Sequence, residues 1–381
     1  MAQRTTMNCS LSVSSKNDFI RYFSISFYSI LIVVGTLGNF IAFLVIRFTR
    51  TMGKSRNVFT ALALADSLTL WINPLRYWIR FIFNFEIRTS NNGMCKLHAF
   101  VSYLSRDVAT WILCILTFER FLVACSPYKS KIFWRGYKKF GVWLIVFFGL
   151  LAKNSAIVWH LEVILSSTHY CFCDTSDTAF RHRFFYWDII IYSIVPSVLL
   201  LIFNVGILKV ISKAKAYRSR ACQQNSASLS MKDSPILKNP CSDETYHSKV
   251  VMNKKSTNLA NRLLIPVTIF HLVTSMPLCI FSILEARLEW KNNKDRDFVS
   301  SVFSIGSFLV MLTSCNNGIN FILYFLSSVT FRRNSKLVLL KFFRCWKLHG
   351  IYERQYFEPN STVISPKSRK QTVNIINEQL C

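Results

Sequence analysis

The chain has 381 residues, of which 51% are hydrophobic and only 17% charged, and it contains 33 Phe. This composition is too apolar for an ordinary soluble domain and indicates a protein whose solvent is a lipid bilayer. A net charge of +27 would suit a nucleic-acid-binding protein. The Lys and Arg residues instead crowd into alternate gaps between apolar runs, which argues against a nucleic-acid partner.

Seven apolar stretches each supply the roughly 20 residues that a helix needs to cross about 30 Å of hydrocarbon. They lie near 21–48, 58–84, 96–124, 138–163, 186–211, 262–288 and 300–326. The sequence therefore predicts an all-α membrane protein, a bundle of seven transmembrane helices over residues 21–327. The pattern gives no sign of a cofactor or a metal site.

The basic residues predict how the bundle is oriented. Most Lys and Arg follow the first, third, fifth and seventh stretches, and cytoplasmic loops carry such an excess. We therefore expect residues 1–20 outside the cell and 328–381 in the cytoplasm. Asn8 begins an Asn-Cys-Ser glycosylation motif in the outer segment. The Ser-, Asn- and Lys-rich residues 219–258 predict a flexible third cytoplasmic loop.

The segment after the seventh stretch alternates apolar and basic residues between Phe331 and Phe343. This pattern predicts a short amphipathic helix lying on the membrane, with Cys345 placed for palmitoylation. A plain basic stretch beside the membrane is the alternative interpretation.

Polar residues inside hydrocarbon are costly, so each is a candidate functional residue. Asn39, Asp66 and Asn316 fall in the middle of the first, second and seventh stretches. They predict a polar core that holds water or a small cation. Hydrogen bonding that merely joins helices explains them equally well.

Two further charges lie inside the bilayer. Asp107 precedes Arg120 by 13 residues, or about 20 Å of helix, and Lys153 follows Lys138 by 15, or about 22 Å. These similar depths make Asp107 and Lys153 a candidate buried salt bridge, with Arg106 as a competitor for the acid. A charge-reversed double variant would test the pair.

Glu119, Arg120 and Phe121 close the third stretch. An adjacent acid and base at a membrane face are either a snorkelling charge with its counter-ion or a lock that holds the helix end.

Several landmarks occur in a fixed order along the seven stretches. They are Gly38-Asn39, Leu62-Ala-Leu-Ala-Asp66, Cys95, Glu119-Arg120-Phe121, Trp143, Pro196, Pro277 and Asn320-Phe-Ile-Leu-Tyr324. With this set the chain resembles a rhodopsin-like G-protein-coupled receptor over roughly residues 20–346. The resemblance implies a plasma-membrane receptor that signals to heterotrimeric G proteins, and it implies no enzyme activity.

The resemblance also implies roles for single residues. Glu119 and Arg120 would hold the inactive state, and the released Arg120 would engage the G protein. From their places in the motifs above, Pro277, Asn320 and Tyr324 would belong to the parts of the receptor that move on activation. Cys95 would form a disulfide with the second outer loop, where Cys171 and Cys173 both qualify and Cys171 is favoured.

The chain departs from the family pattern at its moving parts. Ser275 replaces the usual tryptophan of the sixth stretch, and Phe321 replaces the usual proline of the seventh. Asn204 replaces a tyrosine, and Ala109 replaces a small hydroxyl residue near the family's sodium site. A receptor-like binding protein with atypical or weak coupling is therefore the alternative. A transporter is disfavoured, because the two halves show no repeat.

The ligand classes of the family can be narrowed. Residues 300–326 contain no lysine for a retinal Schiff base, and Ser102 stands where amine receptors carry an aspartate. Ser102, Tyr103, Asp188 and Glu285 are candidate pocket residues. Carboxylates among aromatic walls favour a cationic ligand such as an amidated peptide with Arg and Phe, although an interfacial aromatic belt gives the same pattern. A likeness to invertebrate neuropeptide receptors of the FMRFamide type points the same way.

Overall fold

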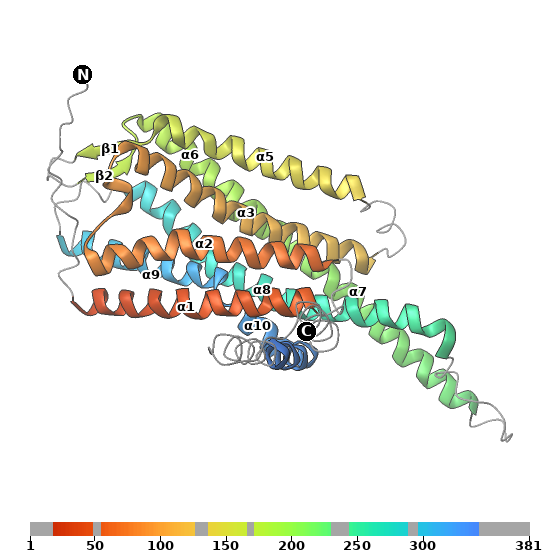
Figure 1. Cartoon of the computed structure of the whole chain (residues 1–381). Helices are drawn as coiled ribbons and strands as arrows, with labels where there is room; N and C mark the ends of the chain where they lie inside the picture. Colours follow the sequence, from red (N-terminus) through yellow and green to blue (C-terminus); the bar gives the residue numbers. More distant parts are fainter. Residues whose placement is uncertain are drawn as a thin grey trace, which may run out of the picture.

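A computed structural model of the chain shows long helices lying side by side (Figure 1). The structure describes residues 18–48, 55–125, 136–165, 171–229, 244–288 and 296–342. The helical elements of the bundle are α1 Asp18–Phe48, α2 Arg56–Phe83, α3 Asn92–Cys125, α5 Gly136–His160, α6 Thr178–Ile189, the π-helical segment η3 Ile190–Ile194, α7 Val195–Leu229, α8 Glu244–Leu288, α9 Arg296–Ser314, the 3-10 turn η5 Cys315–Asn317 and α10 Asn320–Ser327.

The described helices match the expected spans. Six of them are long and apolar enough to cross a membrane. A seventh span is made of two parts, 304–317 and 320–327, which meet at a bend of 58°. The predicted all-α seven-helix bundle is thus confirmed.

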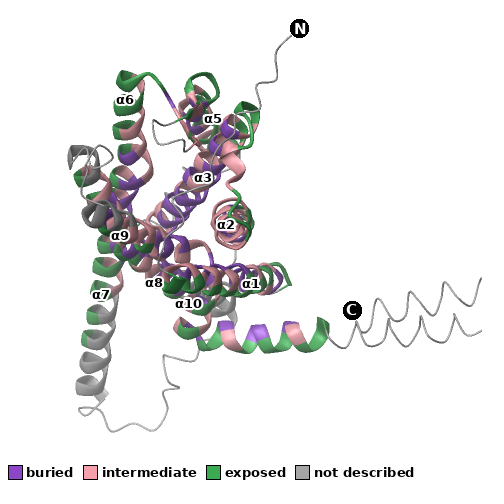
Figure 2. Ribbon diagram, turned by 90° about the vertical axis from the view of Figure 1, so that its left-hand side faces the viewer, coloured by how far each residue is buried: buried purple, intermediate pink, exposed green. Residues whose placement is uncertain are grey.

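The helix α3 forms the centre of the bundle. It carries buried residues along its whole length, as Figure 2 shows, whereas α5 at the edge exposes Phe140, Ile145 and Phe148. Apolar side chains on an outer helix face stay exposed because the surrounding lipid is as apolar as they are. The burial pattern therefore follows from a bilayer as the solvent.

The bend in the seventh span has no proline. It occurs where the short 3-10 turn η5 ends at Gly318. A Cβ added to Gly35 of α1 would lie 2.8 Å from the backbone Cα of Gly318. The two glycines therefore let α1 approach the bend closely, and Phe321 packs beside them against Gly38.

One end of the bundle carries a small β-hairpin, and we name it the hairpin end. Strand β1 Glu162–Leu165 pairs antiparallel with β2 Cys171–Asp174. The 3-10 turn η2 Ile87–Thr89 lies beside the hairpin, at the start of α3 (Figure 1). The opposite end, where α10 finishes, is named the α10 end.

A further helix, residues 329–342, follows α10 and runs at a steep angle to the bundle (Figure 2). Its Phe331 is buried against Tyr324, with ring centroids 5.6 Å apart, while Leu337 and Leu340 are exposed. The predicted amphipathic helix after the seventh span is confirmed. Asn8 and Cys345 lie outside the described residues.

The expected flexible loop is partly helical. Within 219–258, α7 continues to Leu229 and α8 begins at Glu244. Residues such as Ala, Lys and Gln favour helix in this region and let the helices continue beyond the apolar spans. Residues 230–243 lie outside the described part of the chain.

Candidate functional site

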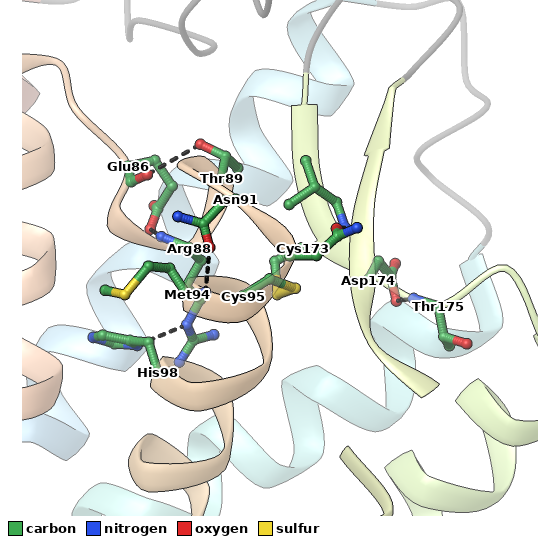
Figure 3. The surroundings of a disulfide bond; sticks show 12 residues. Glu86, Arg88, Thr89, Asn91, Met94, Cys95, His98, Cys173, Asp174 and Thr175 are labelled. Carbon is green, nitrogen blue, oxygen red and sulfur yellow. Dashed lines mark hydrogen bonds between the residues drawn. A yellow bond between two sulfur atoms is a disulfide. The ribbon is translucent and has the colours of Figure 1, made fainter. Parts of the chain in front are cut away.

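The hairpin is fastened to α3 by a disulfide between Cys95 and Cys173, whose Cα atoms are 5.4 Å apart (Figure 3). The expectation that favoured Cys171 as the partner is wrong. The strand register explains the choice, because Cys173 lies opposite Val163, whose backbone N–H donates to Asn92 at the start of α3. Cys171 lies two residues earlier, at the start of the strand, and is in a disulfide bond of its own.

At the α10 end, the Glu119 carboxylate has two partners in addition to Arg120. Its Oε1 atom accepts from Ser55 Oγ at 2.7 Å and from Arg120 Nη2 at 3.3 Å. Its Oε2 atom accepts from Lys139 Nζ of α5 at 2.7 Å. Glu119 and Arg120 are 2% and 3% exposed. The predicted acid–base pair is therefore present, but Lys139 and Ser55 make the shorter contacts with the acid.

The predicted polar core divides into separate contacts. Asn320 Nδ2 donates to Asp66 Oδ2 at 2.5 Å, and both residues are buried. Asn39 donates instead to the carbonyl of Asn317 at 2.9 Å and so ties α1 to the seventh span. A small cavity in the described part of the bundle is lined by Leu62, Asp66, Arg106, Ala109, Thr110, Leu113, Tyr192, Val267, His271, Asn316, Asn317 and Asn320.

The third residue of that predicted core, Asn316, joins two helices at the place of the missing tryptophan. Thr274 Oγ1 donates to Asn316 Oδ1 at 2.6 Å, and Asn316 Nδ2 donates to Ser275 Oγ at 3.2 Å. Thr313 adds a hydrogen bond to the carbonyl of Thr274. Small polar side chains therefore connect α8 with the seventh span where the family places a large ring, and Pro277 lies half-buried just beyond them in α8.

The helices α3, α5 and α6 share a cluster of four charges. Lys153 Nζ lies 2.8 Å from Asp107 Oδ2 and also contacts Asp188. Arg106 Nη2 contacts Asp188 at 2.8 Å. Asn154 donates to Asp107 as well, and the Asp107 side chain is fully buried. The predicted Asp107–Lys153 pair is confirmed as one link of this neutral four-charge cluster.

Aromatic rings enclose the cluster. The Arg106 guanidinium lies 4.8 Å from the centroid of Tyr103 and 4.1 Å from that of Tyr192, as in a cation–π contact. Phe184 packs edge-on against Tyr103 at 5.5 Å. Of the predicted pocket residues, Tyr103 and Asp188 thus belong to one site, while the side chain of Glu285 lies outside the described residues.

Ser102, the remaining predicted pocket residue, belongs to a second cluster nearer the hairpin. Its hydroxyl donates to Asn73 Oδ1 and accepts from Arg88 Nη2 at 2.8 Å. Arg88 Nε donates to His98 Nδ1 at 3.1 Å, as Figure 3 shows. This cluster joins η2, α2 and α3.

Glu86 lies at the start of η2 and pairs with two arginines of α2. Arg76 contacts it with Nε at 2.6 Å and Nη2 at 3.0 Å, and Arg80 with Nη1 at 3.5 Å. Burial by itself would raise the pKa of Glu86, but the hydrogen bond and charge of Arg76 outweigh it and lower that pKa. Glu86 is therefore a firmly ionised carboxylate.

Comparison with known proteins identifies the bundle. The family model of the seven-transmembrane receptors of the rhodopsin family matches residues 38–320, which is most of the chain. The chain belongs to the rhodopsin family of seven-transmembrane receptors. It is accordingly a receptor that signals through G proteins and not an enzyme.

Individual relatives add detail. The neuromedin U receptor homolog nmur-2 of Caenorhabditis elegans is 30% identical over 113 residues, which cover 28% of each chain. Neuropeptide receptor 22 of the same organism is 31% identical over 100 residues, or 26% of this chain and 23% of that receptor. A purinoceptor of Gallus gallus is 25% identical over 396 positions, covering 99% of this chain and 91% of the relative.

The sequence reasoning missed the arginines of the hairpin end and Lys139. Arg76 is a charge in the middle of an apolar stretch, so the rule that such charges are functional candidates applies to it directly. Arg88 and Lys139 gave no comparable signal, because they lie in gaps or at helix ends where basic residues are common.

Proposed function

We propose that a peptide binding at the hairpin end activates this receptor and that Arg120 at the α10 end passes the signal to the G protein. The observation that carries the proposal is the state of Arg120. It is buried at the end of the central helix and bonded to Glu119, as expected of an inactive state. The aromatic and charged side chains around Arg106 lie nearer the other end of the same helix.

The proposal includes an orientation in the plasma membrane. The Cys95–Cys173 disulfide favours the hairpin end as the outside, because disulfides persist in oxidising surroundings. Lys139, Arg332 and Arg333 lie toward the α10 end, which suits the cytoplasm. Residues 1–17 would then be extracellular, with Asn8 open to glycosylation, and Cys345 would be open to palmitoylation inside.

A neuropeptide is the ligand class that the relatives favour, since nmur-2 and neuropeptide receptor 22 are named for such ligands. An amidated peptide with Arg and Phe is the form we propose first. The stacking of Arg106 between Tyr103 and Tyr192 shows that the aromatic side chains of this region accept a guanidinium group. Asp188 offers a peptide little free charge, because Arg106 and Lys153 already bind it.

A purine ligand is the second candidate. The similarity to the Gallus gallus purinoceptor extends over 99% of this chain, and the arginines near η2 suit an anionic ligand. A ligand screen separates the two classes, because only one of them will give a saturable response.

The test is a second-messenger assay in cells that display the receptor. Amidated peptides, their free-acid forms and purine nucleotides are applied, and calcium and cyclic nucleotides are measured. The receptor is expected to respond most strongly to an amidated peptide. Arg120→Ala should abolish the response at unchanged surface level. A response that survives Arg120→Ala, or a receptor that binds peptide without responding, would favour the atypical binding protein.

A further inference from the structure

Around Glu86 at the hairpin end, three arginines lie near one carboxylate. Arg76 occupies both oxygens of Glu86, and Arg80 shares one of them. Arg88 lies two residues after Glu86 and donates its backbone N–H, not its guanidinium, to that carboxylate. Within the described residues, no carboxylate lies within 4.0 Å of its guanidinium. One acid therefore faces three arginines.

Neutral groups hold the Arg88 guanidinium in place. His98 accepts at Nδ1 from Nε, so the ring carries its proton on Nε2 and is uncharged. Ser102 accepts from Nη2, and Asn73 orients the Ser102 hydroxyl by accepting its proton. A guanidinium has five N–H donors. None of the described residues accepts a hydrogen bond from Nη1, so one side of the guanidinium remains free to bind another group.

The electrostatics of the site also leave room for an anion. Burial and the positive charge of Arg76 lower the pKa of Arg88 to about 10. The side chain is still protonated at neutral pH, but its charge is poorly compensated. Arg88 is half-buried, and a partly desolvated cation without a counter-ion is less stable than a paired one. An anion bound to the free side of the fork would reduce that cost.

We infer that Arg88, positioned by His98 and Ser102, binds an oxyanion of the ligand. Because an amidated peptide has no terminal carboxylate, the oxyanion is either the carboxylate of an acidic side chain of a peptide or a phosphate. The planar fork of arginine matches both groups with two parallel hydrogen bonds. Arg88 lies beside Cys95 of the disulfide (Figure 3), at the end where the proposed function places the ligand. The inference rests on the proposed function in one respect, namely that the bound anion is part of the receptor's ligand.

The test measures thermal unfolding of the purified full-length receptor in detergent. N-acetyl-glutamate and inorganic phosphate are titrated separately, against sodium chloride at matched ionic strength. At least one of the two anions is expected to raise the unfolding temperature in a saturable way. The anion that does so tells a carboxylate site from a phosphate site.

Arg88→Gln should abolish the rise, because it removes the charge. Arg88→Lys should keep a rise that saturates at a several-fold higher concentration, since a lysine keeps the charge but not the fork. Arg181→Gln is the matched control. Arg181 is an exposed arginine at the same end with its own partner, Asp174, so the control should respond like the unmodified receptor.

Three results would overturn the inference. They are no rise with either anion beyond that of chloride, a rise that persists in Arg88→Gln, and an equal loss in Arg181→Gln. The assay needs no agonist. An unsuccessful peptide screen would therefore leave this result standing, and failure here would leave the peptide proposal untouched.

Discussion

Neutralising Lys153 is expected to destabilise the bundle more than neutralising Asp107. In Lys153→Met the fully buried Asp107 keeps only the amide of Asn154, while Arg106 still compensates Asp188. Removing one partner of a buried ion pair costs about 3–5 kcal/mol. In Asp107→Asn the lysine still contacts Asp188, so we expect a loss of about 1–3 kcal/mol.

The double variant Asp107→Asn with Lys153→Met should be more stable than Lys153→Met alone. It restores neutrality and leaves the Arg106–Asp188 pair intact. Charge reversal of Asp107 and Lys153, in contrast, should not restore stability. An acid at 153 would face Asp188, and a base at 107 would lie close to Arg106, so like charges would meet.

The assay is thermal unfolding of the purified receptor, together with surface expression in cells. Arg181→Met is the control, because the Arg181–Asp174 pair is 43% and 26% exposed and such a pair contributes at most about 1 kcal/mol. The reasoning is refuted if the neutral double variant is as unstable as Lys153→Met, or if Lys153→Met costs no more than the control.

Two other variants probe the α10 end and the bend of the seventh span. Lys139→Gln leaves Glu119 free to hold Arg120 more tightly and so favours the inactive state. A shift of about 1 kcal/mol in the equilibrium between inactive and active states would lower ligand-independent G-protein activation about fivefold. An increase in that activation per surface receptor would contradict this expectation. Gly35→Ala places a Cβ 2.8 Å from backbone and should cost about 1–3 kcal/mol in thermal unfolding. Gly141→Ala meets nothing within 4 Å, and an equal loss there would contradict the expected clash.

The sequence alone determined the architecture. A bilayer leaves no water to satisfy backbone groups, so a long apolar stretch must become a helix whatever surrounds it. For that reason the seven spans and the helix after them followed from hydrophobic length and pattern. The rise per residue of a helix is also a local property, and it was enough to predict that Asp107 and Lys153 lie at the same depth in the membrane.

Apart from pairs such as Asp107–Lys153, the tertiary structure decided which partners the polar groups take. Cys171 and Cys173 are chemically equal in the sequence, and only the hairpin register against α3 brings Cys173 to Cys95. Likewise, Asp188 resembles a free pocket carboxylate until Arg106 and Lys153 are placed beside it. Such contacts depend on the rotation and spacing of neighbouring helices, and these arise from packing across the whole bundle, which no local pattern encodes.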